Sequence, residues 1–250
     1  LSLVVRNEPT GIRRYVHMGT GNYNPKTARL YEDLGLLSAD NTLGEDVNKL
    51  FNQLSGFAPQ TSFSRLLVAP RTLRSGLLER IENEIKGAQE GKPAGIRMKL
   101  NSILDEEFIE ALYRASAAGV KVELVVRGIC AIRAGVPGLS ENIRVRSILG
   151  RFLEHSRIFH FTNGGSDELW IGSADLMHRN LDRRVESMVR MIDPDHKRLL
   201  MRTLDHYLNP SSPAWEMRAD GGWHHALLGA QSEPLMDFHS QVIDWYKDHE

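Results

Sequence analysis

The chain has 250 residues, and 41% of them are hydrophobic, which is enough for one large or two modest globular domains and excludes a largely disordered protein. Its 31 basic and 32 acidic side chains nearly cancel, so only a local basic cluster would attract a polyanion. The single cysteine, Cys130, excludes an internal disulfide and a cysteine-rich metal site and favours a reducing, cytoplasmic location. No apolar run approaches the roughly 20 residues of a membrane span, so any association with the inner membrane face would be peripheral.

The start of the chain predicts two strands, residues 1–5 and 12–18, joined by a turn. Asp40 or Asn41 can cap a following helix. The apolar stripe of that helix consists of Leu43, Val47, Leu50, Phe51 and Leu54. A stretch containing glycine and proline at residues 56–61 follows, and we expect the first domain to end there.

Beyond residue 62 the apolar patterns of strands and helices alternate. Strands are predicted at residues 63–69, 96–101 and 120–126, and helices at residues 73–85 and 108–118. This alternation favours an α/β domain with a largely parallel sheet. Lys99, Asn101 and Arg127 stand at the carboxyl ends of two strands, where open α/β sheets bind ligands. A guanidinium such as that of Arg127 can grip two phosphate oxygens, and the alternative for it is a salt bridge at a strand end.

A hairpin is predicted where a strand at residues 158–161 turns and returns at residues 168–171. Antiparallel pairing would bring residues 172–175 back towards His155. His155 could then attack or protonate a phosphoryl group, and Arg157 could neutralise its oxygens, while small residues let backbone N–H groups approach. The alternative is a partly exposed histidine with no role in chemistry.

Two stretches of the chain resemble each other. Each ends a strand, continues through a loop of small residues from Gly19 or Gly172, and reaches a glutamate, Glu32 or Glu186, a similar distance on. Such a repeat implies two similar domains with one site between them. His155 lies 17 residues before Gly172, and no histidine stands at the corresponding place in the first copy. We therefore expect the first copy's histidine to be missing from this chain.

The carboxyl-terminal part predicts a helix that Pro194 and Asp195 open and that Asn209-Pro210 ends. From Glu216 onward there are seven acidic residues and two basic ones, and residues 235–246 predict an amphipathic helix. Local basic clusters precede this part of the chain. They consist of Arg144, Arg146, Arg151 and Arg157, and of Arg179, Arg183, Arg184 and Arg190.

The histidine, the hairpin and the Gly-Ser loop resemble the phospholipase D-like superfamily, in which two half-sites pair their histidines. The match to bacterial polyphosphate kinases is closer and runs from about residue 1 to about residue 210. The motifs that carry it lie at residues 15–24, 26–31, 99–101, 125–128, 153–157 and 173–180. The resemblance implies a phospholipase D-like domain with a mixed, largely parallel sheet flanked by helices, preceded by the end of a second similar domain. The expected units are residues 1–60, residues 61–215, and an acidic tail with a terminal helix at residues 216–250.

The resemblance further implies reversible transfer of the γ-phosphate of ATP to inorganic polyphosphate through a phosphohistidine. The family's nucleophilic histidine lies just upstream of a strand like residues 1–5, so we expect the carboxyl-terminal part of a larger kinase that is inactive alone. His155 would be the catalytic partner, as general acid or as stabiliser of the transferring group. Arg127 and Arg157 would hold phosphates, and Tyr31 would border the nucleotide base. The supporting pocket residues would be His17, Asn22, Lys99, Asn101 and Arg179.

The partners follow from the same resemblance. ATP or ADP and polyphosphate are the expected substrates, and Mg²⁺ is expected with the nucleotide because it bridges phosphates and offsets their charge. We expect no dedicated protein site for the metal, since the residues show no set of metal ligands. The upstream domains of the same enzyme and further copies of the chain are expected partners, and nucleic acid is not.

Two other functions remain open at this point. A phosphodiesterase of the same superfamily would cleave lipid or nucleic acid and would need two complete histidine half-sites. Against it, Arg157 and Asp175 stand where such phosphodiesterases usually have lysine and asparagine. The other possibility is a fragment without catalysis that binds polyphosphate or assembles with the parent's other subunits.

Overall fold

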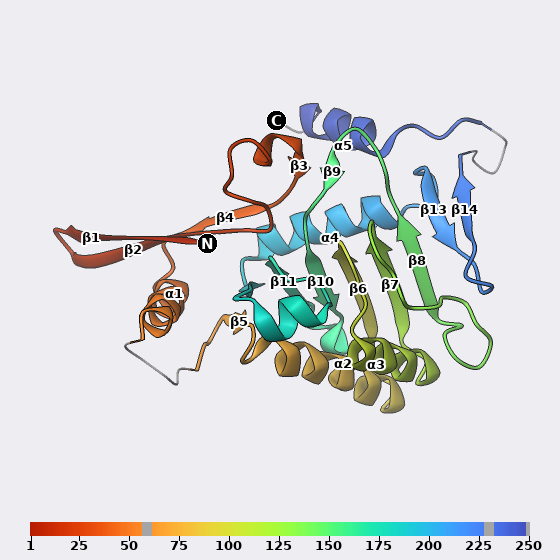
Figure 1. Ribbon diagram of the computed structural model, residues 1–250, viewed down its shortest axis with the longest axis horizontal. Coiled ribbons are helices and arrows are strands. Elements are labelled where there is room, and N and C mark those ends of the chain that lie inside the picture. Colours follow the sequence, from red (N-terminus) through yellow and green to blue (C-terminus); the bar gives the residue numbers. More distant parts are fainter. Residues whose placement is uncertain (57–61, 228–232, 249–250) are drawn as a thin grey trace.

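The computed structural model describes residues 1–56, 62–227 and 233–248. Within these ranges a nine-stranded sheet forms the body, and a three-stranded sheet extends from one side of it (Figure 1). The helices are α1 Asn41–Leu54, α2 Leu73–Gln89, α3 Glu106–Ala117, α4 Pro194–Leu208 and α5 Phe238–Lys247. The large sheet contains, in spatial order, β14 Trp223–Ala226, β13 Ala214–Met217, β8 Ile143–Ser147, β7 Lys121–Val126, β6 Gly95–Leu100, β10 Ile158–Phe161, β11 Glu168–Gly172, β12 Ser187–Met191 and β5 Leu66–Val68. The smaller sheet contains β1 Ser2–Glu8, β2 Gly11–Gly19 and β4 Gly35–Ser38, and β3 Tyr31–Glu32 pairs with β9 Leu153–Glu154.

The large sheet is mixed, and helices flank it, as the sequence predicted. Its parallel part is smaller than predicted, because only β6, β7 and β8 run parallel to one another. The other neighbours pair antiparallel, including β10 with both β6 and β11. The turn between β10 and β11 is short, and a short turn can only reverse the chain, whereas parallel strands need a long crossover such as α3 provides.

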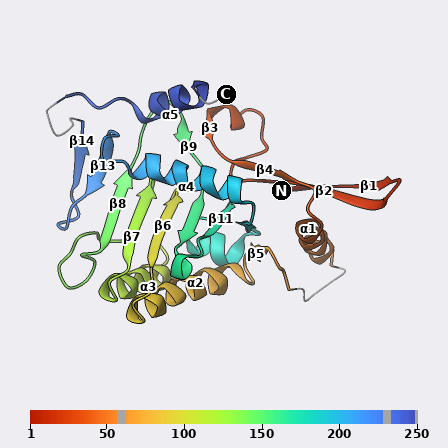
Figure 2. The same ribbon diagram turned by 180° about the vertical axis from the view of Figure 1, so that it is seen from behind.

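Helices cover both faces of the sheet. Figures 1 and 2 show α2 and α3 on one face and α4 crossing the other. The side chains of β7 alternate accordingly: Leu124 and Val126 pack in the core beneath α2 and α3, and Val125 packs with Tyr207 of α4. Each of these aliphatic side chains is buried, which contributes about 1.5–3 kcal/mol apiece to the hydrophobic stabilisation.

The first helix, α1, is capped at its start by Asp40, one of the two capping residues that the sequence predicted. The carboxylate of Asp40 accepts a hydrogen bond from the Leu43 amide at 2.8 Å, which begins α1. The stripe is only partly buried, since Phe51 and Leu54 at the end of the helix are exposed. The inner residues of the stripe pack with Val16 of β2. Residues 57–61 of the expected linker lie outside the described residues.

The two repeated stretches form the same antiparallel arrangement, β1-β2-β4 and β10-β11-β12. In the first copy Gly19 stands opposite Gly35, and in the second Gly172 stands opposite Met188. This register equates Asp33, not Glu32, with Glu186, because each lies two residues before the partner of its glycine. The predicted equivalence of the two glutamates is therefore wrong by one residue, and Glu32 belongs to β3 instead.

Gly172 is required by the close approach of β11 and β12. A Cβ at this position would lie 2.2 Å from the carbonyl oxygen of Ser187 and 2.7 Å from Cα of Met188. We expect Gly172→Ala to lower the free energy of unfolding in urea by about 1–3 kcal/mol, because backbone atoms must separate to admit the methyl group. The control is Gly87→Ala in α2, where the nearest atom would be 4.0 Å away and helix propensity favours a gain of up to about 1 kcal/mol. Equal stability of the two variants would contradict this close approach.

Two arginines of the predicted basic cluster at residues 144–157, Arg146 and Arg157, are buried and do not belong to a charged surface. Arg146 is fully buried in β8, and its guanidinium donates to the carbonyl oxygens of Tyr207, Asn209 and Ser212. These carbonyls lie at the carboxyl end of α4 and just beyond it, where a helix leaves acceptors unpaired. Arg146 therefore serves the fold, and a pattern of charge along the sequence could not show this.

The carboxyl-terminal part extends the sheet through β13 and β14 and ends with α5. Residue 216, where the acidic tail was expected to start, lies inside β13. Among the helices in the described part of the chain, none combines the length and the apolar character that crossing a membrane demands.

Candidate active site

A polar pocket of about 600 Å³ opens where the smaller sheet meets the carboxyl ends of β6 and β7. Most of the predicted site residues line it. These are Asn22, Tyr31, Asn101, Arg127, His155, Arg157 and Arg179. The segments that carry them are brought together by the pairing of β3 with β9, which places Tyr31 opposite Leu153. Residues more than a hundred positions apart in sequence therefore share one pocket.

His155 follows β9 and is held on two sides. Its backbone amide donates to the Glu32 carbonyl oxygen at 2.9 Å, and its ring stacks on Tyr31 with 4.1 Å between the ring centres. Burial, followed by the positive charges of Arg157 and Arg127, lowers the pKa of His155 to about 4. The imidazole is therefore neutral at pH 7. A terminal nitrogen of Arg127 lies 3.4 Å from Nδ1, and a guanidinium only donates, so Nδ1 is the acceptor and Nε2 carries the proton.

Arg127 points its guanidinium into the pocket from the end of β7. Its Nε donates to the side-chain oxygen of Asn101 at 2.8 Å, which fixes the plane of the group. Burial, and then the nearby charge of Arg157, lowers the pKa of Arg127, although an arginine stays charged in proteins. Within the described residues Nε and one terminal nitrogen have partners, so further donors remain for an anion.

Arg157 is bound by the protein itself. It is 6% exposed and forms an ion pair with Asp175 at 2.9 Å. The other terminal nitrogen donates to the carbonyl oxygens of Thr20 and His155 at 3.0 and 2.8 Å. Asp175 in turn accepts from the Asn101 amide at 2.8 Å. Arg157 therefore connects the loop at Thr20 with the segments at His155 and Asp175, and it adds positive charge to the pocket. Few of its N–H donors are left for a ligand.

Two predicted pocket residues lie elsewhere. Lys99 does not line the pocket, because it stands opposite Val125 and so points to the face that α4 covers. It is 2% exposed, and its Nζ donates to Ser156 Oγ at 2.6 Å. His17 lines a smaller neighbouring cavity of about 110 Å³ that shares Asn22 with the main pocket. Its Nδ1 lies 2.5 Å from the Tyr23 hydroxyl, which suits a supporting position.

Comparison with known proteins identifies the family. The model for polyphosphate kinase C-terminal domain 1 matches residues 1–60, and the model for C-terminal domain 2 matches residues 66–235. The chain belongs to the polyphosphate kinase family. A polyphosphate kinase from Streptomyces coelicolor is 56% identical over 244 residues, which are 98% of this chain and 33% of that protein. A polyphosphate kinase from Mycobacterium tuberculosis is 55% identical over 249 residues, which cover 95% of this chain and 33% of that protein.

The fold agrees with this membership. The crystal structure of the polyphosphate kinase from Porphyromonas gingivalis superposes with a TM-score of 0.89 at 35% identity, over 99% of this chain and 38% of that one. The present chain spans about a third of the length of the curated relatives that it matches.

The pocket is also lined by residues that were not predicted as site residues, among them Asn180 and Glu186. Glu186 accepts hydrogen bonds from Ser173 and, at 2.7 Å, from the side-chain nitrogen of Asn180. The Asn180 side-chain oxygen is buried without a partner among the described residues. Glu186 belongs to the repeat, and Asn180 follows Arg179 in a family motif, so both were visible in the sequence as motif members. Their contacts with each other depend on the fold of the loop.

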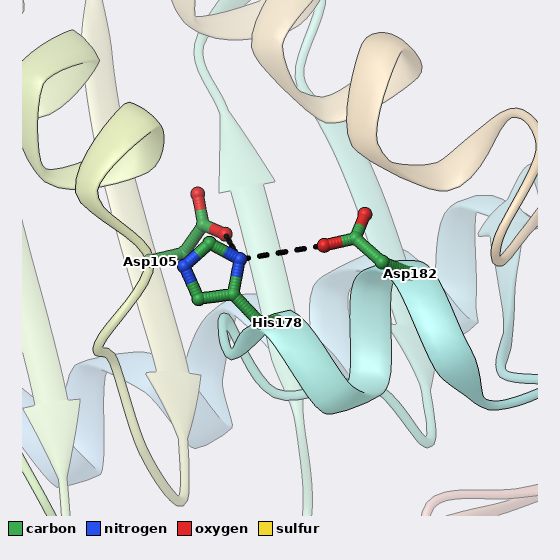
Figure 3. Close-up of side chains that lie close together, drawn as sticks. All are labelled: Asp105, His178 and Asp182. Carbon is green, nitrogen blue, oxygen red and sulfur yellow. Dashed lines mark hydrogen bonds and ion pairs between the residues drawn. The ribbon is translucent and has the colours of Figure 1, made fainter.

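A second cluster lies behind the loop that carries Arg179. Asp105, His178 and Asp182 bring potential metal-ligating atoms within 4.8 Å of one another (Figure 3). The guanidinium of Arg74 already binds both carboxylates, at 2.7 Å to Asp105 and 2.8 Å to Asp182. Asp105 also caps α3. The cluster is therefore an ion-pair network that connects the π-helical turn Arg179–Arg183 to the amino-terminal ends of α2 and α3.

The described residues that line the pocket do not supply the free oxygen ligands of a resident Mg²⁺ site. The carboxylates that line it are Asp175 and Glu186. Arg157 binds the first, and Ser173 and Asn180 bind the second. Mg²⁺ prefers carboxylate oxygens that are free to bind it, together with water and phosphates.

Proposed function

We propose that this chain is the carboxyl-terminal catalytic region of a polyphosphate kinase, which reversibly moves the γ-phosphate of ATP onto inorganic polyphosphate through a phosphohistidine. The observation that carries the proposal is a neutral His155 between the Tyr31 ring and the Arg127 guanidinium in a polar pocket. The names of the relatives support the substrates, ATP and polyphosphate. The chain alone is proposed to be inactive.

The nucleophile is proposed to be a second histidine, contributed from outside residues 1–250. Ile158 of β10 stands opposite Ile171, and continuing the register of β1 and β2 by one residue places Leu1 opposite Met18. Since Met18 and Ile171 are equivalent in the repeat, Leu1 corresponds to Ile158. The counterpart of His155 would then stand three positions before Leu1, which itself lines the pocket.

In this scheme a nitrogen of the second histidine attacks the γ-phosphorus, the bond to the bridging oxygen breaks, and ADP leaves with the electron pair. A terminal oxygen of polyphosphate then displaces the histidine nitrogen. Arg127 holds phosphate oxygens, and the charge of Arg157 stabilises the anionic group. The Nε2–H of His155 donates to an oxygen of the transferring group. The negative charge of the substrate raises the pKa of His155 from its low value, which lets it also supply a proton.

Tyr31 provides the test of this function in the full-length enzyme. ATP should form from ADP, Mg²⁺ and polyphosphate, and Tyr31→Ala should raise KM for ADP about tenfold, because stacking on an aromatic ring contributes about 1–3 kcal/mol per base. Tyr31→Phe keeps the ring and should stay near the wild-type KM. Absence of ATP formation, or a KM for ADP that is indifferent to Tyr31→Ala, would contradict the proposal. Hydrolysis of a model phosphodiester that is insensitive to Tyr31→Ala would point instead to a phosphodiesterase.

A further inference from the structure

Glu154, the residue before His155, lies at the centre of a buried polar network. Its Oε1 accepts from Nε2 of His239 at 2.7 Å, and its Oε2 accepts from the Tyr207 hydroxyl at 2.5 Å and from Lys99 at 2.9 Å. Burial acts to raise the pKa of Glu154, but the charge of Lys99 and the hydrogen bonds from His239, Lys99 and Tyr207 outweigh it and lower the pKa to about 2. The carboxylate is therefore ionised at neutral pH, with both oxygens bonded.

Both ring nitrogens of His239 form hydrogen bonds with the segment that precedes His155. The Phe152 amide donates to Nδ1 at 3.4 Å, which leaves Nε2 as the N–H donor to Glu154. The ring also packs closely on Gly150, where a Cβ would lie 2.4 Å from Nδ1. One buried imidazole thus holds the backbone of Phe152 and the side chain of Glu154, on both sides of Leu153.

The strand held in this way sets the position of the catalytic ring. β9 pairs with β3, which places Glu154 opposite Glu32, and the next amide, that of His155, donates to the Glu32 carbonyl oxygen. Tyr31, the other residue of β3, stacks on the His155 ring. A shift of β9 would therefore move His155 relative to both Tyr31 and Arg127.

His239 belongs to α5, which lies alongside β9 in both views (Figures 1 and 2). The buried residues of this helix are Phe238 and His239. Phe238 stacks on Tyr207 with 4.4 Å between ring centres, and other α5 side chains line an apolar cavity of about 240 Å³ with α4. The apolar contacts hold α5 on the body of the protein, whereas His239 connects it to the segment that carries the site.

We propose that His239 is a positioning residue, which holds Glu154 and the backbone at Phe152 so that His155 meets its substrate in the productive orientation. The α5 helix is thereby part of the active-site architecture, although it contributes no side chain to the polar pocket. The proposal deepens the function proposed above, on which it rests for the catalytic role of His155.

The test uses the full-length kinase. His239→Phe keeps the ring volume and removes both hydrogen bonds, and we expect kcat to fall about 10- to 100-fold, the cost of displacing a reacting group by about 1 Å. KM for ADP and polyphosphate should change by less than about threefold, because the substrate contacts remain. His239→Gln restores an N–H donor for Glu154 and should recover most of kcat. The matched control is His206→Phe, which makes the same replacement in α4 beside the same apolar cavity. Among the described residues the side-chain partners of Glu154 are Tyr207, His239 and Lys99, so this control leaves them in place.

A second measurement does not depend on activity. Hydrogen exchange at the His155 amide, which is bonded to Glu32, should be about tenfold faster in His239→Phe, with exchange in β6 and β7 unchanged. A folded His239→Phe variant with wild-type kcat and exchange would overturn the proposal. Equal losses in His206→Phe, no recovery in His239→Gln, or faster exchange throughout the chain would also overturn it, since each indicates general destabilisation. If wild-type enzyme transfers no phosphate, or His155→Ala keeps normal turnover, the proposed function fails, and the exchange comparison still decides the positioning role.

Discussion

His155→Ala in the full-length kinase should lower phosphoryl transfer by at least about 10³-fold, within the range that positioned acid–base groups contribute. The substitution removes the only imidazole that lines the described part of the polar pocket, and with it the N–H that we propose donates to the transferring group. ATP binding should stay within a few-fold, because Arg127 and Tyr31 are untouched. Single-turnover transfer from ATP measures the first quantity, and equilibrium binding of a non-hydrolysable ATP analogue measures the second.

The control for this result is His196→Ala, which removes an exposed imidazole from the first turn of α4. It should leave both transfer and binding near wild type. Normal turnover in His155→Ala would show that the catalytic assignment is wrong. A parallel loss of binding and transfer would instead assign His155 to substrate binding, because a group that acts only in the transition state leaves ground-state affinity unchanged.

Arg146→Met should lower the free energy of unfolding by about 3–5 kcal/mol, because it leaves several buried carbonyl oxygens without a donor, at a cost of about 1–3 kcal/mol each. The guanidinium is fully buried and donates to the carbonyl oxygens of Tyr207, Asn209 and Ser212. Methionine fills similar space and offers no donor, so buried acceptors at the end of α4 lose their partners. Urea unfolding monitored by circular dichroism measures the difference.

Arg144→Met is the matched control, since Arg144 lies two residues earlier in the same strand and pairs with Glu216. Its side chain is 35% exposed, and such ion pairs contribute about 1 kcal/mol or less. Similar losses in the two variants would show that Arg146 stabilises the protein only through charge. A loss below about 1 kcal/mol in Arg146→Met would show that these carbonyls find other donors.

The sequence predicted the elements whose signals are local. The cap at Asp40, the hairpin at residues 158–171 and the helix opened by Pro194 all form where their patterns place them. A capping side chain, a turn and an apolar stripe act over a few residues, so the sequence contains nearly all the information that each needs. Motif resemblance extended this to the site, and residues such as Arg127 and His155 do share one pocket.

The face to which a side chain points and the pairing direction of the strands could not be predicted from local patterns. Lys99 and Asn101 lie two apart in a segment predicted as one strand, yet Lys99 is buried beneath α4 and Asn101 lines the pocket, because β6 ends at Leu100. The predicted sheet was too parallel because the alternating helices and strands in the middle of the chain were recognised, and the antiparallel strands β12, β13 and β14 were not. Short strands with mixed burial have weak apolar patterns.

The sequence by itself determined the family and the class of fold and indicated candidate residues for the chemistry, since caps, apolar periods and motifs are properties of neighbouring residues. Tertiary structure decided which charges are used for binding and which for the fold. Arg157 is committed to Asp175, and Arg146 is committed to the end of α4. It also decided that His239 reaches Glu154 across 85 positions of sequence. Such contacts form between segments that meet only when the whole core is packed, and burial then determines whether a charged or polar group needs a protein partner.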